Sequence, residues 1–548
     1  MNSRAQLLHS GTVFTGAGSP DVDAVLLVDG RIAGLGAEAH RLAEAATDAG
    51  SEVLRTDLSG AFVSASFGDG HAHPLFGGLE EAGPRVRACG SVEEIVAEVK
   101  RFAEEHPELE WIFGASYDGS LAPEGLFDAR WLDEAVPDRP VVLRAWDYHT
   151  VWVNSAALAA AGITRDTPDP QLGEITHRED GEPLGILREW GAVDLIMDVA
   201  PTRPQEERLR ALEAAGEYYL ARGVTWVQDA WVEPGDVDTY LEAAAADRLP
   251  LRFNLAQYAD PRKFEAQLPR FVADHQRVQA AKHPRLTANT IKFFADGVVE
   301  NETGALLEPY CSALHKHGMS VWPGDMLKNA VVAADAEGFQ IHVHAIGDAA
   351  VRQALDAFEA AIAANGPRDR RPVIAHAQLI DEADLGRFAQ LGVIPCMQPL
   401  WAQQDALMTV LTVPRLGEER SDRQYQLNSL QDSGAALSFG SDWPVSSGDP
   451  RDGLAIAMSR TTTEGLPAGG WTPQEIVAPE LALAAYTSGV AHQAFADSLD
   501  APWGEISEGN AADLVILARD PREQAPHDLP QNPILATYLG GAVVHRQA

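Results

Sequence analysis

The chain has 548 residues, 45% hydrophobic and 22% charged, a composition typical of globular proteins with a large core. Its formal net charge of −38 argues against nucleic acid and anionic membrane as partners, because both select surfaces rich in Lys and Arg. We interpret the acidity as a solvated surface, the alternative being attraction of cationic substrates.

The three cysteines, Cys89, Cys311 and Cys396, include no CxxC pair, so neither a disulfide framework nor a thiolate zinc site is indicated. Instead they are predicted to be small buried side chains. The first residues lack the apolar core of a signal peptide, and no 18-residue apolar run occurs. These features predict a cytoplasmic protein.

Both ends of the chain have the pattern of short β-strands. Residues 24–28 lead into the turn pair Asp29-Gly30, and strand character resumes at residues 31–33. Residues 512–517 and 542–544 have the same character. We therefore expect residues 1–65 and 498–548 to meet in one composite β domain.

In the middle of the chain, strand-like and helix-like segments alternate, which is typical of parallel strands joined by helices. Helices are expected at residues 203–221, 327–336 and 381–391, and a helix-capping box at residues 472–475. The strand-like runs number eight, which predicts an α/β fold of the (β/α)₈ TIM-barrel type. They lie at residues 66–73, 223–229, 251–257, 290–294, 340–344, 372–376, 393–397 and 436–440.

One connection in this barrel is much too long. About 130 residues separate His73 from the helix near Arg203, whereas such loops usually have about 2–6 residues. We expect an inserted α+β subdomain at residues 76–200, with a helix beginning at Ser91 and a strand at residues 141–145. Residues 66–75 and 201–497 would then form the barrel.

Metal-binding residue types occur where the predicted barrel strands end. In His71-Ala72-His73 the two imidazoles are two residues apart, so on a strand they point to one face and can share a metal at about 2.0–2.1 Å. His344, His376 and Asp442 end the fifth, sixth and eighth runs, the edge of a barrel that carries chemistry. Three histidine-bearing strands and a carboxylate suit Zn²⁺ or a similar metal.

Two further polar residues, His342 and Lys292, lie within the predicted strands. His342 lies two residues before His344, and we interpret it as an interior residue or one that contacts the ligands rather than as a ligand itself. Lys292, in the fourth run, is an inward-facing amine among apolar residues, which is costly unless the amine is neutral or paired. A neutral amine can take up CO₂ and bridge two metals as a carbamate; the alternative is an ordinary ion pair with Asp296 or Glu300.

Taken together, these blocks resemble the amidohydrolase superfamily, specifically the YtcJ-like amidohydrolase family 3, which includes N-substituted formamide deformylases. The resemblance extends over nearly the whole chain and is specific for the family but not for a substrate. Its blocks are DGRI at 29–32, DGHAH at 69–73, WVNSAAL at 152–158, GEPLGILRE at 181–189, GVTWVQD at 223–229, KFFADG at 292–297, HAIGD at 344–348, HAQ at 376–378, SDWP at 441–444 and GNAADL at 509–514.

The resemblance implies a metal-bearing barrel with a small β-sandwich built from both termini. It implies one or two divalent ions, with Zn²⁺ expected, and a carboxylated Lys292 as bridging ligand. In some subtypes a glutamate bridges instead, and Glu189 is the alternative here. The terminal ligands that it assigns are His71, His73, His344, His376 and Asp442.

The sequence departs from the family pattern at three places. Ala65-Ser66 stands where Pro-Gly is usual before the first metal motif, Ala375 where Glu is frequent, and Asn510 where Lys is frequent. None of these departures removes a proposed ligand. The change at Ala375 removes a charged neighbour of the metal ligands.

The expected activity is hydrolysis of a non-peptide C–N bond in a small N-substituted amide, formamide or cyclic amide. A metal lowers the pKa of its water from 15.7 towards about 7, Asp442 would act as the acid and base, and His149 would stabilise the oxyanion. The residues expected to contact substrate are Asn154, Tyr117, Asp118 and Trp443.

Two other functions stay open on the sequence. The first is a deaminase of a cyclic or heteroaromatic amine that uses the same site. The second, from another class, is a catalytically silent barrel with a binding or regulatory role. The sequence does not determine the substrate or the oligomeric state, although a homo-oligomer is compatible with it.

Overall fold

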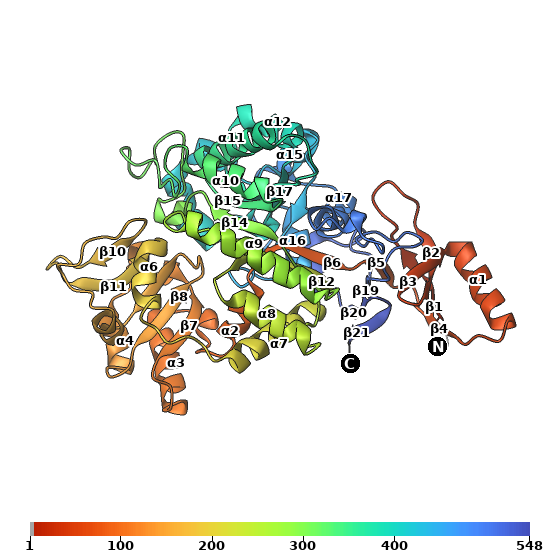
Figure 1. Ribbon diagram of the computed structural model, residues 1–548, viewed down its shortest axis with the longest axis horizontal. Coiled ribbons are helices and arrows are strands. Elements are labelled where there is room, and N and C mark those ends of the chain that lie inside the picture. Colours follow the sequence, from red (N-terminus) through yellow and green to blue (C-terminus); the bar gives the residue numbers. More distant parts are fainter. Residues whose placement is uncertain (1–4, 548) are drawn as a thin grey trace.

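A parallel eight-stranded barrel stands at the centre of the computed structural model, which describes residues 5–547 (Figure 1). The order of the strands around the barrel is their order in the chain. Backbone hydrogen bonds at or just after the ends of the first and last strands connect these two. There the Asp442 amide donates to the His71 carbonyl, and the His73 amide to the Trp443 carbonyl, both at 2.7 Å. The strands are β6 (Phe67–Ala72), β12 (Val224–Val232), β13 (Arg252–Tyr258), β14 (Leu286–Phe294), β15 (Gln340–Ala345), β16 (Val373–His376), β17 (Ile394–Met397) and β18 (Ser438–Phe439).

All eight predicted runs coincide with these strands, so the predicted barrel is confirmed. The expected helices at residues 203–221, 327–336 and 381–391 are α7, α10 and α12. The helices that connect or follow the strands are α7 (Gln205–Leu220), α8 (Asp236–Ala245), α9 (Phe264–Ala281), α10 (Met326–Ala336), α11 (Asp348–Asn365), α12 (Glu382–Leu391), α15 (Leu427–Asp432), α16 (Pro450–Ala457), α17 (Pro479–Tyr486) and α18 (Ser488–Gln493).

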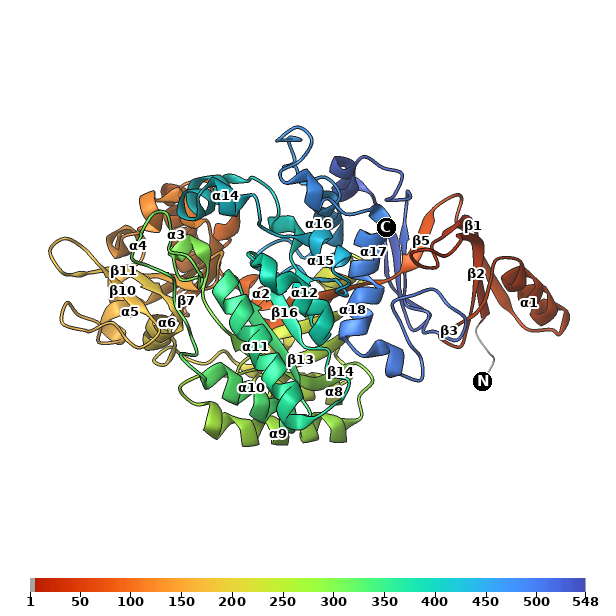
Figure 2. The ribbon, with the colours of Figure 1, turned by 90° about the horizontal axis from the view of Figure 1, so that it is seen from above.

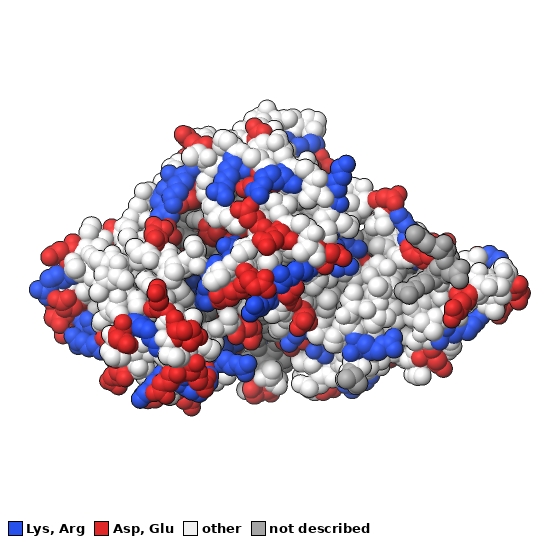
Figure 3. Space-filling model, turned by 60° about the horizontal axis from the view of Figure 1, so that its bottom comes forward, with Lys and Arg blue, Asp and Glu red and all other residues white. Residues whose placement is uncertain are grey.

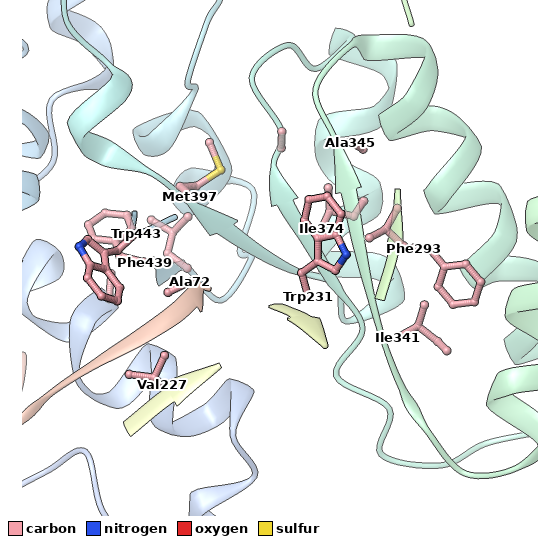
Figure 4. Close-up of a cluster of buried hydrophobic side chains, with 14 of the residues drawn as sticks. Ala72, Val227, Trp231, Phe293, Ile341, Ala345, Ile374, Met397, Phe439 and Trp443 are labelled. Carbon is pink, nitrogen blue, oxygen red and sulfur yellow. The ribbon is translucent and has the colours of Figure 1, made fainter. Parts of the chain in front are cut away.

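The barrel strands are buried on both faces, as expected for a parallel sheet covered by helices, and they carry buried polar as well as apolar side chains. All nine residues of β12 are buried, as are all six of β15. Most apolar side chains of the barrel strands join one large cluster; those labelled in Figure 4, such as Val227, Phe293 and Ile374, come from different strands. This rigid framework holds the strand ends on which the candidate site is built.

Strands from the two ends of the chain share a second sheet, on the side of the barrel opposite the insertion (Figures 1 and 2). Antiparallel pairing of β5 with β19 joins the two halves, and α1 (Gly36–Asp48) packs on β2. Residues 1–4 and 548 of the predicted composite domain lie outside the described residues. Its strands are β1 (Ala5–Val13), β2 (Val22–Val28), β3 (Arg31–Leu35), β4 (Val53–Asp57), β5 (Phe62–Ala65), β19 (Leu514–Leu517), β20 (Ile534–Leu539) and β21 (Ala542–Arg546).

The long connection after β6 forms its own five-stranded sheet with helices. Ser91 caps α3 (Val92–Glu105) by accepting a bond from the Glu94 amide, as predicted. The strands of this insertion are β7 (Ile112–Tyr117), β8 (Val141–Ala145), β9 (Thr150–Val153), β10 (Glu174–His177) and β11 (Pro183–Arg188). Its other main helices are α4 (Ala129–Ala135), α5 (Ser155–Ala160) and α6 (Glu189–Met197), and α2 (Pro74–Glu80) leads into it.

Two smaller sequence predictions were wrong. Thr472 has a left-handed backbone and precedes only a 3-10 turn (Pro473–Glu475), to which its side chain makes no capping bond. Glu475 instead accepts bonds from the amide and hydroxyl of Ser429, and the next α-helix begins only at Pro479. Cys396 is buried, but Cys311 is exposed and Cys89 is partly exposed.

No helix within residues 5–547 is long and apolar enough to cross a membrane. On the face shown in Figure 3, acidic and basic side chains are interspersed, without a continuous basic surface. This distribution agrees with the interpretation of the negative charge as a solvated acidic surface.

A buried carboxyl group in the barrel wall predicts pH-dependent stability. Burial raises the pKa of Asp229 to about 8, although the Tyr240 hydroxyl donates to it. Since the folded state then binds more protons than the unfolded state between pH 4 and 8, this residue makes stability fall as pH rises through that window. We expect Asp229→Asn to gain more than about 1 kcal/mol relative to wild type at pH 8 compared with pH 5, measured by urea unfolding. Asp247→Asn, at an exposed carboxylate, is the control and should show no such difference.

Candidate metal centre

The five predicted terminal ligands converge at the carboxyl ends of the barrel strands. His71 and His73 lie at the end of β6, His344 on β15, His376 on β16 and Asp442 directly after β18. All are buried, and all line one cavity of about 370 Å³ between the barrel and the insertion. The structure thus brings together residues separated by as many as 371 positions in the chain, from His71 to Asp442.

Three of these residues form a compact cluster. The ligand atoms of His71, His73 and Asp442 all lie within 4.8 Å of one another. Asp442 Oδ1 is 2.8 Å from His73 Nε2 and 3.3 Å from His71 Nε2, yet it accepts no hydrogen bond from the described residues. A buried carboxylate oxygen without a donor is costly unless a cation binds it, so this cluster fits a divalent metal.

His344 and His376 form the other half of the centre, with ring centroids 4.7 Å apart. His376 Nδ1 is 2.8 Å from Gln398 Oε1, and the His376 ring stacks on Trp401 at an interplanar angle of 4°. His344 Nε2 is 3.1 Å from the Gly297 carbonyl. One nitrogen of each ring is thereby fixed, leaving Nε2 of His376 and Nδ1 of His344 for a metal.

Lys292 is fully buried on β14, and its Nζ has no hydrogen-bond partner among the described residues. Burial lowers the pKa of this amine to about 7, so a large fraction is neutral at neutral pH. Asp296 is not its partner, because both Asp296 oxygens accept backbone amides, from Ile346, Ala305 and Gly347. The expected alternative of a Lys292–Asp296 pair is therefore not found.

Glu189 begins α6 in the insertion, with a left-handed backbone (φ 62°) that is uncommon for a non-glycine residue. It is buried, and both carboxylate oxygens have protein partners. Oε2 lies 2.8 Å from His149 Nδ1, and Oε1 accepts a 2.6 Å hydrogen bond from the Thr303 hydroxyl. This arrangement holds Glu189 against His149 rather than on the cavity surface.

The protonation states of the imidazoles suit metal binding. Burial lowers the pKa values of His71, His73 and His344, and that of His376 to about 3, so these rings are neutral, the form that binds metals. Burial also lowers the pKa of His149, but the Glu189 carboxylate more than offsets it, so the pKa is raised overall.

Asp442 has the opposite balance. Burial raises its pKa, but the His73 Nε2 group 2.8 Å away and the electrostatic effects of His73, His376 and the Lys292 amine more than compensate, and the pKa is lowered overall. Asp442 and His376 both have left-handed backbones, with φ of 59° and 75°. Strained non-glycine residues of this kind concentrate at functional sites, where the surrounding structure compels them.

Of the four residues expected to contact substrate, only Tyr117 lines the cavity. Asn154 is fully buried inside the insertion, where it caps α5 by accepting from the Ala157 amide and donates to the carbonyls of Val136 and Arg139. Asp118 accepts from the Ser120 amide in a surface turn. Asn154 and Asp118 therefore have roles in local structure, because their side chains satisfy backbone groups.

The expectation for Trp443 is also corrected by the structure. Its ring stacks on Tyr218 at 4.5 Å between centroids and covers Gly77, where any Cβ would clash with the indole. Trp443 does not line the cavity. Its preceding neighbour Asp442 lines the cavity and has a left-handed backbone. The apolar cavity wall is instead formed by residues such as Trp231, Phe294 and Trp401.

Two buried residues support the ligands. His342, expected to be an interior residue or one that contacts the ligands, is fully buried with its Nε2 2.7 Å from His71 Nδ1, so it orients the His71 ring. Asp69 accepts bonds from the amide and hydroxyl of Ser441, the His71 amide and the Tyr219 hydroxyl. The only sequence signal for Asp69 was its place in the DGHAH block.

Asp69 connects the end of β6, which carries His71 and His73, with Ser441, the neighbour of Asp442. Its four donors occupy the four acceptor positions of a carboxylate. Asp69→Asn would set an amide N–H group against at least one donor, shifting β6 relative to Ser441. We expect metal affinity to fall by about 10- to 100-fold, measured by competition with a chelator. Tyr219→Phe, which removes one donor and leaves the carboxylate, should have a smaller effect. Equal affinity in wild type and Asp69→Asn would contradict this role.

Comparison with known proteins agrees with this site. The model of the amidohydrolase family matches residues 56–545. The chain belongs to the amidohydrolase family. Over 95–98% of its length it is 32% identical to Protein LONG AFTER FAR-RED 3 of Arabidopsis thaliana, 29% to the putative amidohydrolase YtcJ of Bacillus subtilis and 28% to the N-substituted formamide deformylase of Arthrobacter pascens, covering 90%, 99% and 94% of these proteins.

A solved structure extends the comparison to the fold of this amidohydrolase. The crystal structure of an uncharacterized metal-dependent hydrolase from Pyrococcus furiosus superposes with a TM-score of 0.72 at 26% identity, covering 95% of this chain and all of the other. The predicted resemblance to the YtcJ-like family is confirmed. Family membership also implies a divalent metal, for which the clustered ligands provide a site.

Proposed function

We propose that this amidohydrolase hydrolyses a non-peptide C–N bond in a small N-substituted amide, formamide or cyclic amide. The main support for this proposal is the buried cluster of His71, His73 and Asp442, in which Oδ1 of Asp442 accepts no hydrogen bond from any described residue. The Lys292 amine also has no hydrogen-bond partner among the described residues. The deformylase among its relatives is named for a reaction of this class.

The residues present fit one or two divalent ions, for which we propose Zn²⁺. His71, His73, His344, His376 and Asp442 would hold them, with Lys292 as a carbamate between the two halves. When bound, the metal would lower the pKa of a water molecule and polarise the carbonyl group. Glu189 remains the alternative ligand, but it would have to leave His149 and Thr303.

The chain's own groups perform the proton transfers. Asp442, ionised and facing the cavity, would take a proton from the attacking water and deliver it to the departing nitrogen. Glu189 raises the pKa of His149, and in its protonated form His149 would donate from Nδ1 to Glu189 and from Nε2 to the developing oxyanion. Trp231, Phe294 and Trp401 would supply an apolar wall beside the reacting groups.

A hydrolysis screen with metal-replete protein tests this proposal. We expect release of an amine from at least one N-formyl, N-acyl or cyclic-imide compound, and loss of that activity in Asp442→Asn. Release of ammonia from amino-heterocycles instead would establish the deaminase alternative. Metal-replete protein inactive on every compound would favour a silent barrel with a binding role.

A further inference from the structure

One wall of the cavity is built by the insertion and holds hydrogen-bond donors without acceptors. Trp146 follows β8 and Arg188 ends β11, and both line the cavity opposite the barrel residues. Neither Trp146 Nε1 nor Arg188 Nε has a hydrogen-bond partner among the described residues. Two buried donors left unsatisfied on one wall are costly unless a ligand accepts from them.

The rest of the Arg188 guanidinium is also poorly paired. Its NH2 group donates one long bond of 3.3 Å to the Glu124 carbonyl, and its NH1 group lies 3.9 Å from Glu174, whose side chain is 56% exposed. A pair with so exposed a carboxylate contributes little. Only 19% of the Arg188 side chain is exposed, so water does not fully replace the missing acceptors.

Two carboxylates that line the cavity, those of Asp147 and Glu300, already accept hydrogen bonds, in contrast to these donors. Asp147 accepts from the amides of His149 and Thr150, the Thr150 hydroxyl and Asn301 Nδ2, so both of its oxygens have partners. Glu300 accepts from the Thr412 hydroxyl. A cationic ligand would have to compete for these acceptors, whereas an anionic ligand would meet donors that are already free.

We propose that the substrate carries a free carboxylate on the portion covered by the insertion, and that Arg188 and Trp146 Nε1 bind it. The substrate class is then an amide that bears a carboxylate. This inference rests on the proposed function for the reaction itself. Water adds its oxygen to the carbonyl carbon, the C–N bond breaks, and the nitrogen leaves with a proton from that water. The distant carboxylate takes no part in the bond changes and serves recognition only.

The carboxylate site can be tested without turnover, by isothermal titration of metal-loaded protein with benzoate and its neutral isostere benzamide. We expect wild type to bind benzoate at least about 10-fold more tightly than benzamide, and Arg188→Met to weaken benzoate binding by about 10- to 100-fold. Arg165→Met, at an exposed arginine of the same insertion, is the matched control and should bind benzoate like wild type. If Arg188→Met fails to fold, Trp146→Phe removes one donor without a change of charge and should also weaken benzoate binding.

Benzoate that binds Arg188→Met as tightly as wild type must occupy the metal instead, and this result would overturn the inference. Equal affinity for benzoate and benzamide would overturn it as well. A second arm compares kcat/KM for N-formyl-4-(aminomethyl)benzoate and N-formylbenzylamine, where wild type should favour the carboxylate and Arg188→Met should bring the ratio close to one. Arg188-dependent benzoate binding without hydrolysis of either amide or of any compound in the hydrolysis screen would refute the proposed reaction alone and leave the carboxylate site supported.

Discussion

Replacement of His71 by alanine is expected to abolish hydrolysis and to lower the metal content. His71 lies in the three-residue cluster, 3.3 Å from Asp442 Oδ1, and its ring is oriented by His342. Loss of even an outer partner of a metal ligand costs about 10- to 100-fold, so loss of the ligand itself should lower kcat/KM by more than about 100-fold. Metal content by plasma emission spectrometry and the rate on the best substrate of the screen measure both effects.

His527→Ala is the control for this experiment, because the His527 side chain is 64% exposed and lies outside the cavity. This variant should retain the metal and the rate of wild type. If His71→Ala instead retains full metal content and full activity, the proposed centre is wrong.

The second large effect is expected at Lys292. Lys292→Ala should lose metal and activity, because the amine that we propose as a bridging carbamate is removed from between the two halves of the centre. Short carboxylic acids such as acetate should restore part of the activity, since they can occupy the space of the missing side chain and supply a carboxylate. Metal content and rate, each with and without added acetate, provide the measurement.

Glu189→Gln separates the two candidate bridges. The Glu189 oxygens are already paired with His149 and Thr303, so we expect this variant to retain at least one metal ion while the rate falls through its effect on His149. A Lys292→Ala protein that binds metal normally, together with a Glu189→Gln protein that does not, would show that Glu189 is the bridge. Loss of metal in both variants would assign the ligand set to both residues.

The sequence by itself determined the barrel and the order of its strands. Short runs rich in β-branched and aromatic residues, such as residues 223–229 and 372–376, alternate with helical segments, which indicates strands of a parallel sheet buried on both faces. Because parallel strands present their carboxyl ends at one edge, residues that end these runs, such as His344 and His376, had to meet there. Local pattern and chain order were sufficient for this inference.

Only the tertiary structure decided which neighbouring side chains face the cavity. Trp443 packs on Tyr218 and Gly77 rather than on the cavity, although it directly follows Asp442, whose left-handed backbone is not favoured by propensity. The Asn154 side chain donates hydrogen bonds to backbone carbonyls 15 and 18 residues away in the chain. Glu189 accepts a hydrogen bond from Thr303, which belongs to the barrel side of the cavity. Such hydrogen bonds join segments with no fixed separation in the chain. Their satisfaction depends on how the insertion folds over the barrel, and no spacing rule in the sequence contains that information.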